Sequence, residues 1–168
     1  MFEPGTIWAY PTDTSFGLGV RCDDREALDR LFDLKVRDRG KPVSLMTKNF
    51  EQLKEYAEVP EDLEEKFFFE KPRTVILKPT DKLPKSEYWP EDKVAFRVCT
   101  MPAVANHIEV PITATSANIS GETPIFQVQE LEKQFGDEVE ICRIFLELPV
   151  QDPSEIYDFT VSARPRLR

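Results

Sequence analysis

The sequence predicts one α/β domain, in which a twisted, largely internal sheet of mixed strand directions is flanked by helices. Two observations lead to this prediction. The spacing of the apolar residues alternates along the chain between the period of a strand and the period of a helix. The 168 residues are also enough to build one sizeable hydrophobic core, and no linker, repeat or low-complexity tract divides them. We therefore treat residues 1–168 as one domain.

The strands are short apolar runs bounded by proline, glycine or charged residues. They are expected over residues 5–12, 42–46, 73–78, 93–99, 111–117, 139–145 and 154–160. A loop rich in proline and lysine joins the third and fourth of these runs. The 111–117 run ends in hydroxyl-bearing residues, and in open α/β sheets ligands bind outside such strand ends.

The helices show their start signals in the sequence. They are expected over residues 23–35, 49–57, 60–69, 101–109 and 127–136. The first opens with Asp23 and Glu26 in the spacing of a capping box, and the second with Asn49 followed by Gln52. The third begins at Pro60, a residue favoured in the first turn of a helix. In the first helix, one apolar face is formed by Ala27, Leu28, Leu31 and Phe32.

The charge balance limits the function classes. A net charge of −9 repels nucleic-acid phosphates, so we do not expect general RNA or DNA binding as the main role. Residues 35–41 nevertheless contain four basic residues and one aspartate, which suits a single small anion. No apolar run has the length of a membrane span and the first residues show no leader pattern, so we expect a cytoplasmic protein.

The cysteines and the histidine do not suggest a metal site. Cys22, Cys99, Cys142 and His107 are far apart in the sequence and lack the paired spacing of zinc ligands. We expect the cysteines to be small core residues in a reducing compartment, and we expect no metal bound by the protein itself.

Four segments carry more polar and basic residues than a connector needs. They are the turn-like stretch YPTDTSFGLG at 10–19, the sequence LKVR at 34–37, the strand VAFRV at 94–98 and the segment TATSANISG at 113–121. Hydroxyls, glycines and cations at strand ends supply the donors that a phosphate or a carboxylate requires. Each segment also has a structural interpretation: a turn, a helix end, an ion pair across a sheet, and a cap.

Taken together in this order, with KPRTVIL at 71–77, these segments resemble the YrdC-like threonylcarbamoyl-adenylate synthases. The resemblance runs from about residue 7 to residue 165 and includes PSEIYDF at 153–159 and ARPR at 163–166. It implies the YrdC-like (DHBP-synthase-like) fold. It also implies a reaction that makes threonylcarbamoyl-AMP and pyrophosphate from L-threonine, bicarbonate and ATP, for a modified adenosine of tRNA.

The resemblance implies site residues and partners. Lys35 and Arg37 are expected to be catalytic. Nucleotide binding is expected from Arg37, Lys41, Ser116, Asn118 and Arg164, and threonine binding from Thr14, Arg97 and Ser154. Mg²⁺ is expected to arrive with ATP, and the product to pass to tRNA-modification proteins, with at most weak RNA binding by this chain. A planar carboxylate matches the guanidinium fork of Arg97, which interrupts an apolar strand.

Two alternatives stay open at this point. One is a YciO-like relative of undefined chemistry, which the intact Lys35-x-Arg37 and Ser116-Ala117-Asn118 disfavour. The other is an RNA-binding module, which the acidic balance and the lack of a basic patch with interleaved aromatic residues disfavour.

Overall fold

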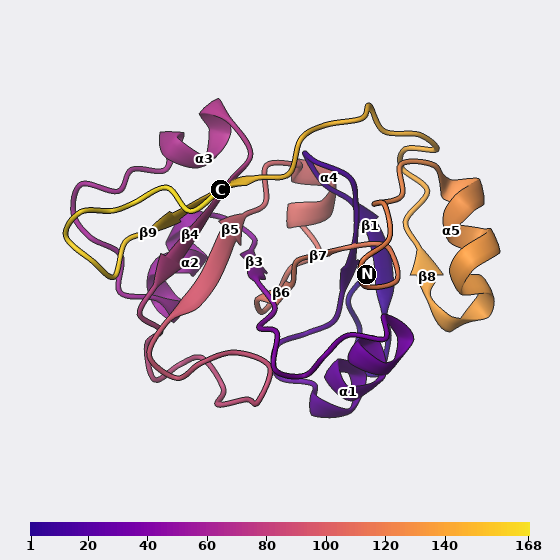
Figure 1. Ribbon diagram of the computed structural model, residues 1–168, viewed down its shortest axis with the longest axis horizontal. Helices are drawn as coiled ribbons and strands as arrows, with labels where there is room; N and C mark the ends of the chain where they lie inside the picture. Colours follow the sequence, from indigo (N-terminus) through magenta and orange to yellow (C-terminus); the bar gives the residue numbers. More distant parts are fainter.

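The computed structural model describes residues 1–168 and arranges nine strands in two mixed sheets (Figure 1). The strands are β1 (Trp8–Pro11), β2 (Phe16–Gly19), β3 (Leu45–Thr47), β4 (Arg73–Leu77), β5 (Val94–Val98), β6 (Ile112–Thr113), β7 (Thr115–Ser116), β8 (Glu140–Ile141) and β9 (Glu155–Asp158). The first sheet has the order β7-β2-β1-β8, and the second has the order β6-β3-β5-β4-β9. The predicted mixed α/β class is confirmed, but the strands form two sheets where one was expected.

The expected strand over 111–117 is the place where the two sheets meet. It divides at Ala114 into β6, which pairs with β3, and β7, which pairs with β2. Thr113 lies opposite Leu45 in one sheet, while Thr115 lies opposite Leu18 in the other. A single short segment therefore passes from the second sheet to the first.

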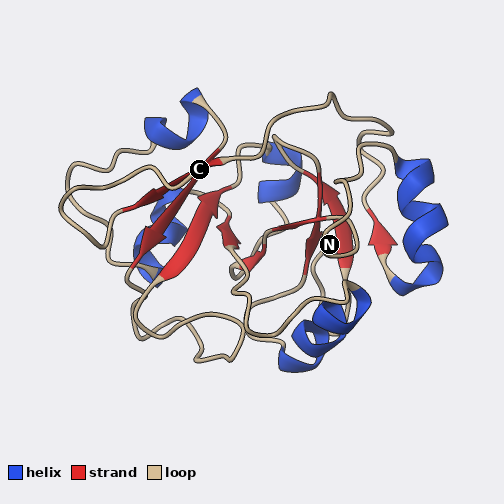
Figure 2. Ribbon diagram, viewed as in Figure 1, coloured by secondary structure: helices blue, strands red, loops and turns tan.

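The helices are short, and most of them lie toward the outer edge of the view, while one lies near its centre between the strands of the two sheets (Figure 2). They are α1 (Arg25–Leu34), α2 (Phe50–Tyr56), α3 (Lys66–Glu70), α4 (Pro102–Ala105), α5 (Val128–Phe135) and the 3₁₀ turn η1 (Gly136–Glu138). The structure contains no helix with the length and apolar character of a membrane span.

Two of the predicted helix starts need correction. The N-cap of α1 is Asp24, not Asp23, because Asp24 accepts the Ala27 N–H at 3.0 Å while Asp23 pairs with Arg21. The helix expected from Pro60 begins only at Lys66. The residues before it form turns that bring Leu63 into the core.

The helix expected over 101–109 is limited to the four residues of α4, whereas the signals of α2 and α5 are confirmed. Asn49 caps α2 by accepting the Gln52 N–H at 2.9 Å, and α5 ends where Gly136 takes a positive φ of 53°. The predicted apolar face of α1 is buried. The helix ends at Lys35, and Val36 then takes a φ of +49°.

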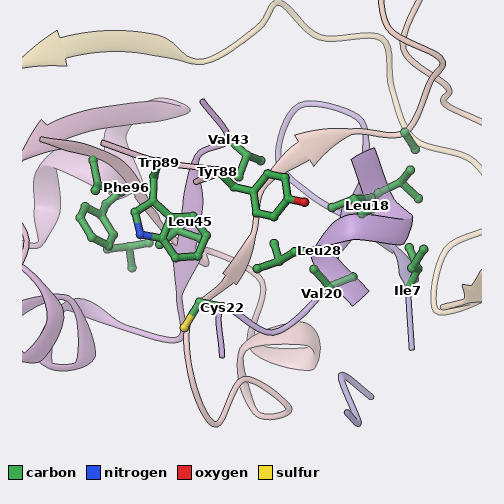
Figure 3. Close-up of a cluster of buried hydrophobic side chains, with 14 of the residues drawn as sticks. Ile7, Leu18, Val20, Cys22, Leu28, Val43, Leu45, Tyr88, Trp89 and Phe96 are labelled. Atoms are coloured by element: carbon green, nitrogen blue, oxygen red, sulfur yellow. The ribbon is translucent and has the colours of Figure 1, made fainter. Parts of the chain in front are cut away.

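One hydrophobic cluster runs through both sheets (Figure 3). In it Leu18 of β2 and Leu28 of α1 belong to the same packed group as Leu45 of β3 and Phe96 of β5. The three cysteines are all buried and unpaired, as expected for small core residues. The core therefore fixes the two sheets relative to each other and leaves their polar strand ends facing one another.

Candidate functional site

A cavity of about 450 Å³ lies between the ends of the two sheets. The first sheet and its turns contribute Tyr10, Thr12, Thr14, Ser15, Phe16, Gly17, Thr115 and Ser116. The second sheet contributes Thr74, Arg97 and Ile156, and connecting segments contribute Arg37, Pro42, Ser44, Ala114, Pro124, Phe126, Gln151, Pro153, Ser154 and Arg168. The lining thus combines hydroxyls with three arginines and includes no aspartate or glutamate.

A hollow of similar volume, about 490 Å³, lies beside α2. Its lining comes from one stretch, residues 50–65, and includes three glutamates and no arginine. The cavity between the sheets is the better candidate for binding an anion, because it gathers cations from three distant parts of an acidic chain.

The stretch 10–19 forms the floor of the cavity. Its turn is held by Thr12, whose Oγ1 donates to the Ser15 carbonyl at 2.7 Å. Thr12 Oγ1 and Thr14 Oγ1 lie 3.0 Å apart, so the second threonine is fixed by the first. Glycine is needed at position 19, because a Cβ there would lie 2.7 Å from Cε1 of the Tyr10 ring. The tight packing of this floor explains the mixture of small and hydroxylated residues.

The three predicted threonine-binding residues, Thr14, Arg97 and Ser154, all line the cavity. Arg97 is 8% exposed, its Nη2 pairs with Asp13, and its Nη1 lies 3.4 Å from Thr14 Oγ1. Its Nε is buried and has no hydrogen-bond partner. Ser154 Oγ lies 2.8 Å from Thr74 Oγ1. Asp13 therefore already compensates part of the Arg97 charge, and the guanidinium keeps further N–H donors that its contacts with Asp13 and Thr14 do not use.

Arg37 lines another part of the cavity. Its Nη2 donates to the Pro42 carbonyl at 2.7 Å, and its Nε donates to the Lys41 carbonyl at 3.2 Å. Burial lowers the pKa of Arg37 below its ordinary value. The Lys41 side chain is exposed and does not line the cavity, contrary to the expectation from the sequence. Only its backbone carbonyl takes part, by accepting the hydrogen bond from Arg37 Nε.

Ser116 lines the cavity and Asn118 does not. Ser116 Oγ donates to Asn118 Oδ1. The Asn118 amide donates to the Ile119 carbonyl at 2.7 Å and to the Glu122 carbonyl at 2.9 Å. Asn118 therefore shapes the turn that presents Ser116.

Lys35 is not on the cavity wall, contrary to the expectation from the sequence. Its side chain is fully enclosed behind the wall, where the ammonium donates to the carbonyls of Ser116 at 2.5 Å and Asn118 at 2.6 Å. Burial, and then the charge of Arg37, lower the pKa of Lys35 to about 8.

Arg164 is also away from the cavity, and Arg168 lies there instead. The chain reverses after β9, so that Ile156 N donates to the Arg168 carbonyl at 3.0 Å. This reversal places Arg168 Nε 3.0 Å from the Ser154 carbonyl, while Arg164 pairs with Asp62 at the surface. Burial and the charge of Arg97 lower the pKa of Arg168. Arg168 therefore adds a second cation to the end of the cavity that holds Arg97.

Sequence reasoning missed several other polar lining residues. They are Thr12, Ser15, Ser44, Thr74, Thr115 and Gln151. Four of them fall within the segments quoted above (10–19, 71–77 and 113–121), so their hydroxyls were a usable signal. Ser44 and Gln151 carry no pattern of their own, because only the meeting of the two sheets brings them to the cavity.

Comparison with known proteins gives consistent family relationships. A protein of Vibrio parahaemolyticus named threonylcarbamoyl-AMP synthase is 34% identical over 169 residues, which cover 95% of this chain and 91% of that protein. A protein of the same name from Aliivibrio fischeri is 37% identical over 146 residues, covering 80% of this chain and 77% of that protein.

Solved structures show the same fold. Pyrococcus abyssi Sua5, crystallised with L-threonine, superposes with a TM-score of 0.86 at 31% identity over 98% of this chain, which spans 50% of that protein. Escherichia coli YciO superposes with a TM-score of 0.82 over 98% of this chain and 82% of that protein; its 22% identity supports the fold alone. The family model described as "Telomere recombination" (Sua5, YciO and YrdC) matches residues 1–168. The chain is a member of the Sua5/YciO/YrdC family.

Proposed function

We propose that this protein is a threonylcarbamoyl-AMP synthase. It would convert L-threonine, bicarbonate and ATP into threonylcarbamoyl-AMP and pyrophosphate, and the product would supply the threonylcarbamoyl group of a modified adenosine in tRNA. Relatives of this name and the Sua5 structure with L-threonine support the proposal. The observation that carries it is the cavity: three arginines, many hydroxyls and no carboxylate side chain line it, in a chain of net charge −9.

The chemistry requires positioning more than it requires a protein nucleophile. Bicarbonate takes up a proton and loses water to give CO₂; the threonine amine then forms a bond to the CO₂ carbon and loses a proton, which gives a carbamate. A carbamate oxygen then attacks the α-phosphorus of ATP, and the bond to the β-phosphate oxygen breaks to release pyrophosphate. The carbamate, the triphosphate and the pyrophosphate all carry negative charge, so arginine guanidinium groups stabilise the reacting groups by position and charge.

The residues divide between the two substrates. Arg97 would bind the threonine carboxylate with Thr14 and Ser154 beside it, because it lines the cavity and its guanidinium has more N–H donors than its contacts with Thr14 and Asp13 use. Arg37 and Ser116 would meet the nucleotide phosphates, and Arg168, at the end of the cavity that holds Arg97 and Ser154, would add positive charge beside the threonine site. Charge-assisted hydrogen bonds of this kind contribute roughly 1.5–3 kcal/mol each.

Mg²⁺ would belong to the substrate MgATP. The cavity lining offers hydroxyls and arginines but no carboxylate, and hard oxygen ligands for Mg²⁺ would therefore come mainly from the phosphates.

Pyrophosphate release tests the proposal. It should require ATP, threonine and bicarbonate together, and each omission should abolish it. Arg37→Ala should reduce turnover strongly and weaken ATP binding, because Arg37 lines the cavity. The control Arg39→Ala removes a neighbouring cation that pairs with Asp29 and Asp33 away from the cavity, and it should retain activity. Folded protein that releases no pyrophosphate in the complete mixture would favour the YciO-like alternative.

A further inference from the structure

Lys35 has the surroundings of a structural cation rather than those of a ligand-binding one. Its side chain is 1% exposed, and its only charged neighbour of consequence is another cation, Arg37. The two carbonyl acceptors, of Ser116 and Asn118, provide its polar contacts. Burying an unpaired ammonium is costly, so these two hydrogen bonds have to compensate for the lost water.

The side chain and the backbone of Lys35 both bind the same loop. The ammonium binds the carbonyls at 116 and 118, and the Lys35 backbone carbonyl accepts the Ser120 N–H at 2.8 Å. The loop over residues 116–120 is thus attached to the end of α1 at three points. Ser116, the first residue of this loop, lines the cavity while its carbonyl points back to Lys35.

The end of α1 separates Lys35 from Arg37. The Arg37 N–H donates to the Phe32 carbonyl at 2.9 Å and the Val36 N–H donates to the Asp33 carbonyl at 3.0 Å, which is a Schellman motif with Val36 in the left-handed region. This turn sends Lys35 behind the wall and Arg37 to its inner surface. Lys35 and Arg37 are therefore two residues apart in the sequence but lie on opposite sides of the cavity wall.

We propose that Lys35 is a positioning residue that acts through the 116–120 loop: its ammonium holds the Ser116 and Asn118 carbonyls and thereby fixes Ser116 for nucleotide binding. The proposal rests on the function proposed above for its effect on ATP. Its structural part, the attachment of the loop, does not depend on that function. Lys35 itself touches no substrate in this scheme.

The test combines hydrogen exchange with kinetics. Lys35→Met keeps the length of the side chain but removes its donors. The Asn118 and Ser120 amides should then exchange about tenfold faster, while amides of β4 and β5 keep their rates. The KM for ATP should rise about tenfold, and the KM for threonine should change less than twofold. Arg39→Met, which removes a cation of the same segment that does not contact the loop, should change neither quantity.

Lys35→Gln is the second variant, because its amide retains donors and should give an ATP KM between those of the wild type and Lys35→Met. Unchanged loop exchange in Lys35→Met, or faster exchange with an unchanged ATP KM, would overturn the proposal. Equal increases in both KM values would also overturn it, since they indicate a general structural defect. If the wild type releases no pyrophosphate, the function proposed above fails, and ATP binding measured by calorimetry takes the place of KM. If Lys35→Met does not fold, Lys35→Gln carries the same two measurements and the same criteria.

Discussion

Val36→Gly should stabilise the protein, although it removes a side chain. Val36 has a φ of +49°, a region in which a β-branched residue is strained, and its side chain is 73% exposed. A left-handed conformation costs an L-residue roughly 1–2 kcal/mol, and glycine avoids this cost. Little burial is lost, because most of the side chain contacts solvent.

The gain is reduced by the greater freedom of glycine in the unfolded chain, roughly 0.4–1 kcal/mol. The net effect on the free energy of unfolding should be about +0.5 to +1 kcal/mol. For a domain of this size that corresponds to a rise in Tm of about 1–4 °C. The two backbone hydrogen bonds of the Schellman motif remain available, so pyrophosphate release should stay within about twofold of the wild type.

Thermal unfolding by circular dichroism measures this effect, with Val150→Gly as the matched control. Val150 is also exposed but has an ordinary negative φ, so glycine there should lower the free energy of unfolding by about 0.4–1 kcal/mol. If Val36→Gly lowers Tm as much as Val150→Gly does, the strain argument is refuted.

Three further predictions concern the cavity. Arg97→Lys keeps the charge but loses the guanidinium fork, so the threonine KM should rise about tenfold while ATP affinity, measured by calorimetry, changes little. Ser116→Ala should weaken ATP binding about five- to tenfold with a small change in Tm. Asn118→Ala should instead lower the free energy of unfolding by about 1–3 kcal/mol, because the Asn118 amide donates to two carbonyls. If calorimetry shows the larger loss of ATP affinity in Asn118→Ala and melting curves show the larger loss of stability in Ser116→Ala, both roles are contradicted. Burial and the charge of Arg37 lower the pKa of Lys35 to about 8, so the free energy of unfolding, measured by denaturant titration at a series of pH values, should show an inflection near pH 8. The Lys35→Met variant should lack this inflection. Between about pH 8 and the ordinary lysine pKa the unfolded chain holds more protons, so this group alone makes the free energy of unfolding rise with pH.

Local patterns were predictable because their causes are local. The apolar spacing of Leu28, Leu31 and Phe32 determines which face of α1 is buried, and the Asn49 cap depends on a residue three positions away. The hydroxyls of the 10–19 stretch and the interrupted apolar strand at Arg97 likewise indicated a polar cavity, because neither is needed by the turn or the strand that contains it.

Features that depend on distant partners were not predictable. The division of 111–117 between two sheets depends on Leu18 and Leu45, each far away in the sequence. The sequence alone does not show which C-terminal arginine reaches the cavity, because the reversal after β9 decides it. The expectation that Lys35 lies on the wall was wrong, because its first carbonyl partner, Ser116, is 81 residues away and no local signal reveals it.

The position of the cavity between the two sheets affects the order in which parts of the protein fold. The contacts that build the cavity join residues far apart in the chain: Asp13 with Arg97, Lys35 with Ser116, and Thr74 with Ser154. Such contacts close long loops, and their entropic cost delays their formation relative to helices and hairpins. The binding site should therefore be completed in the last folding step. A ligand bound there would stabilise the whole domain at once by mass action, and no proteolytic fragment containing only one sheet should retain measurable affinity.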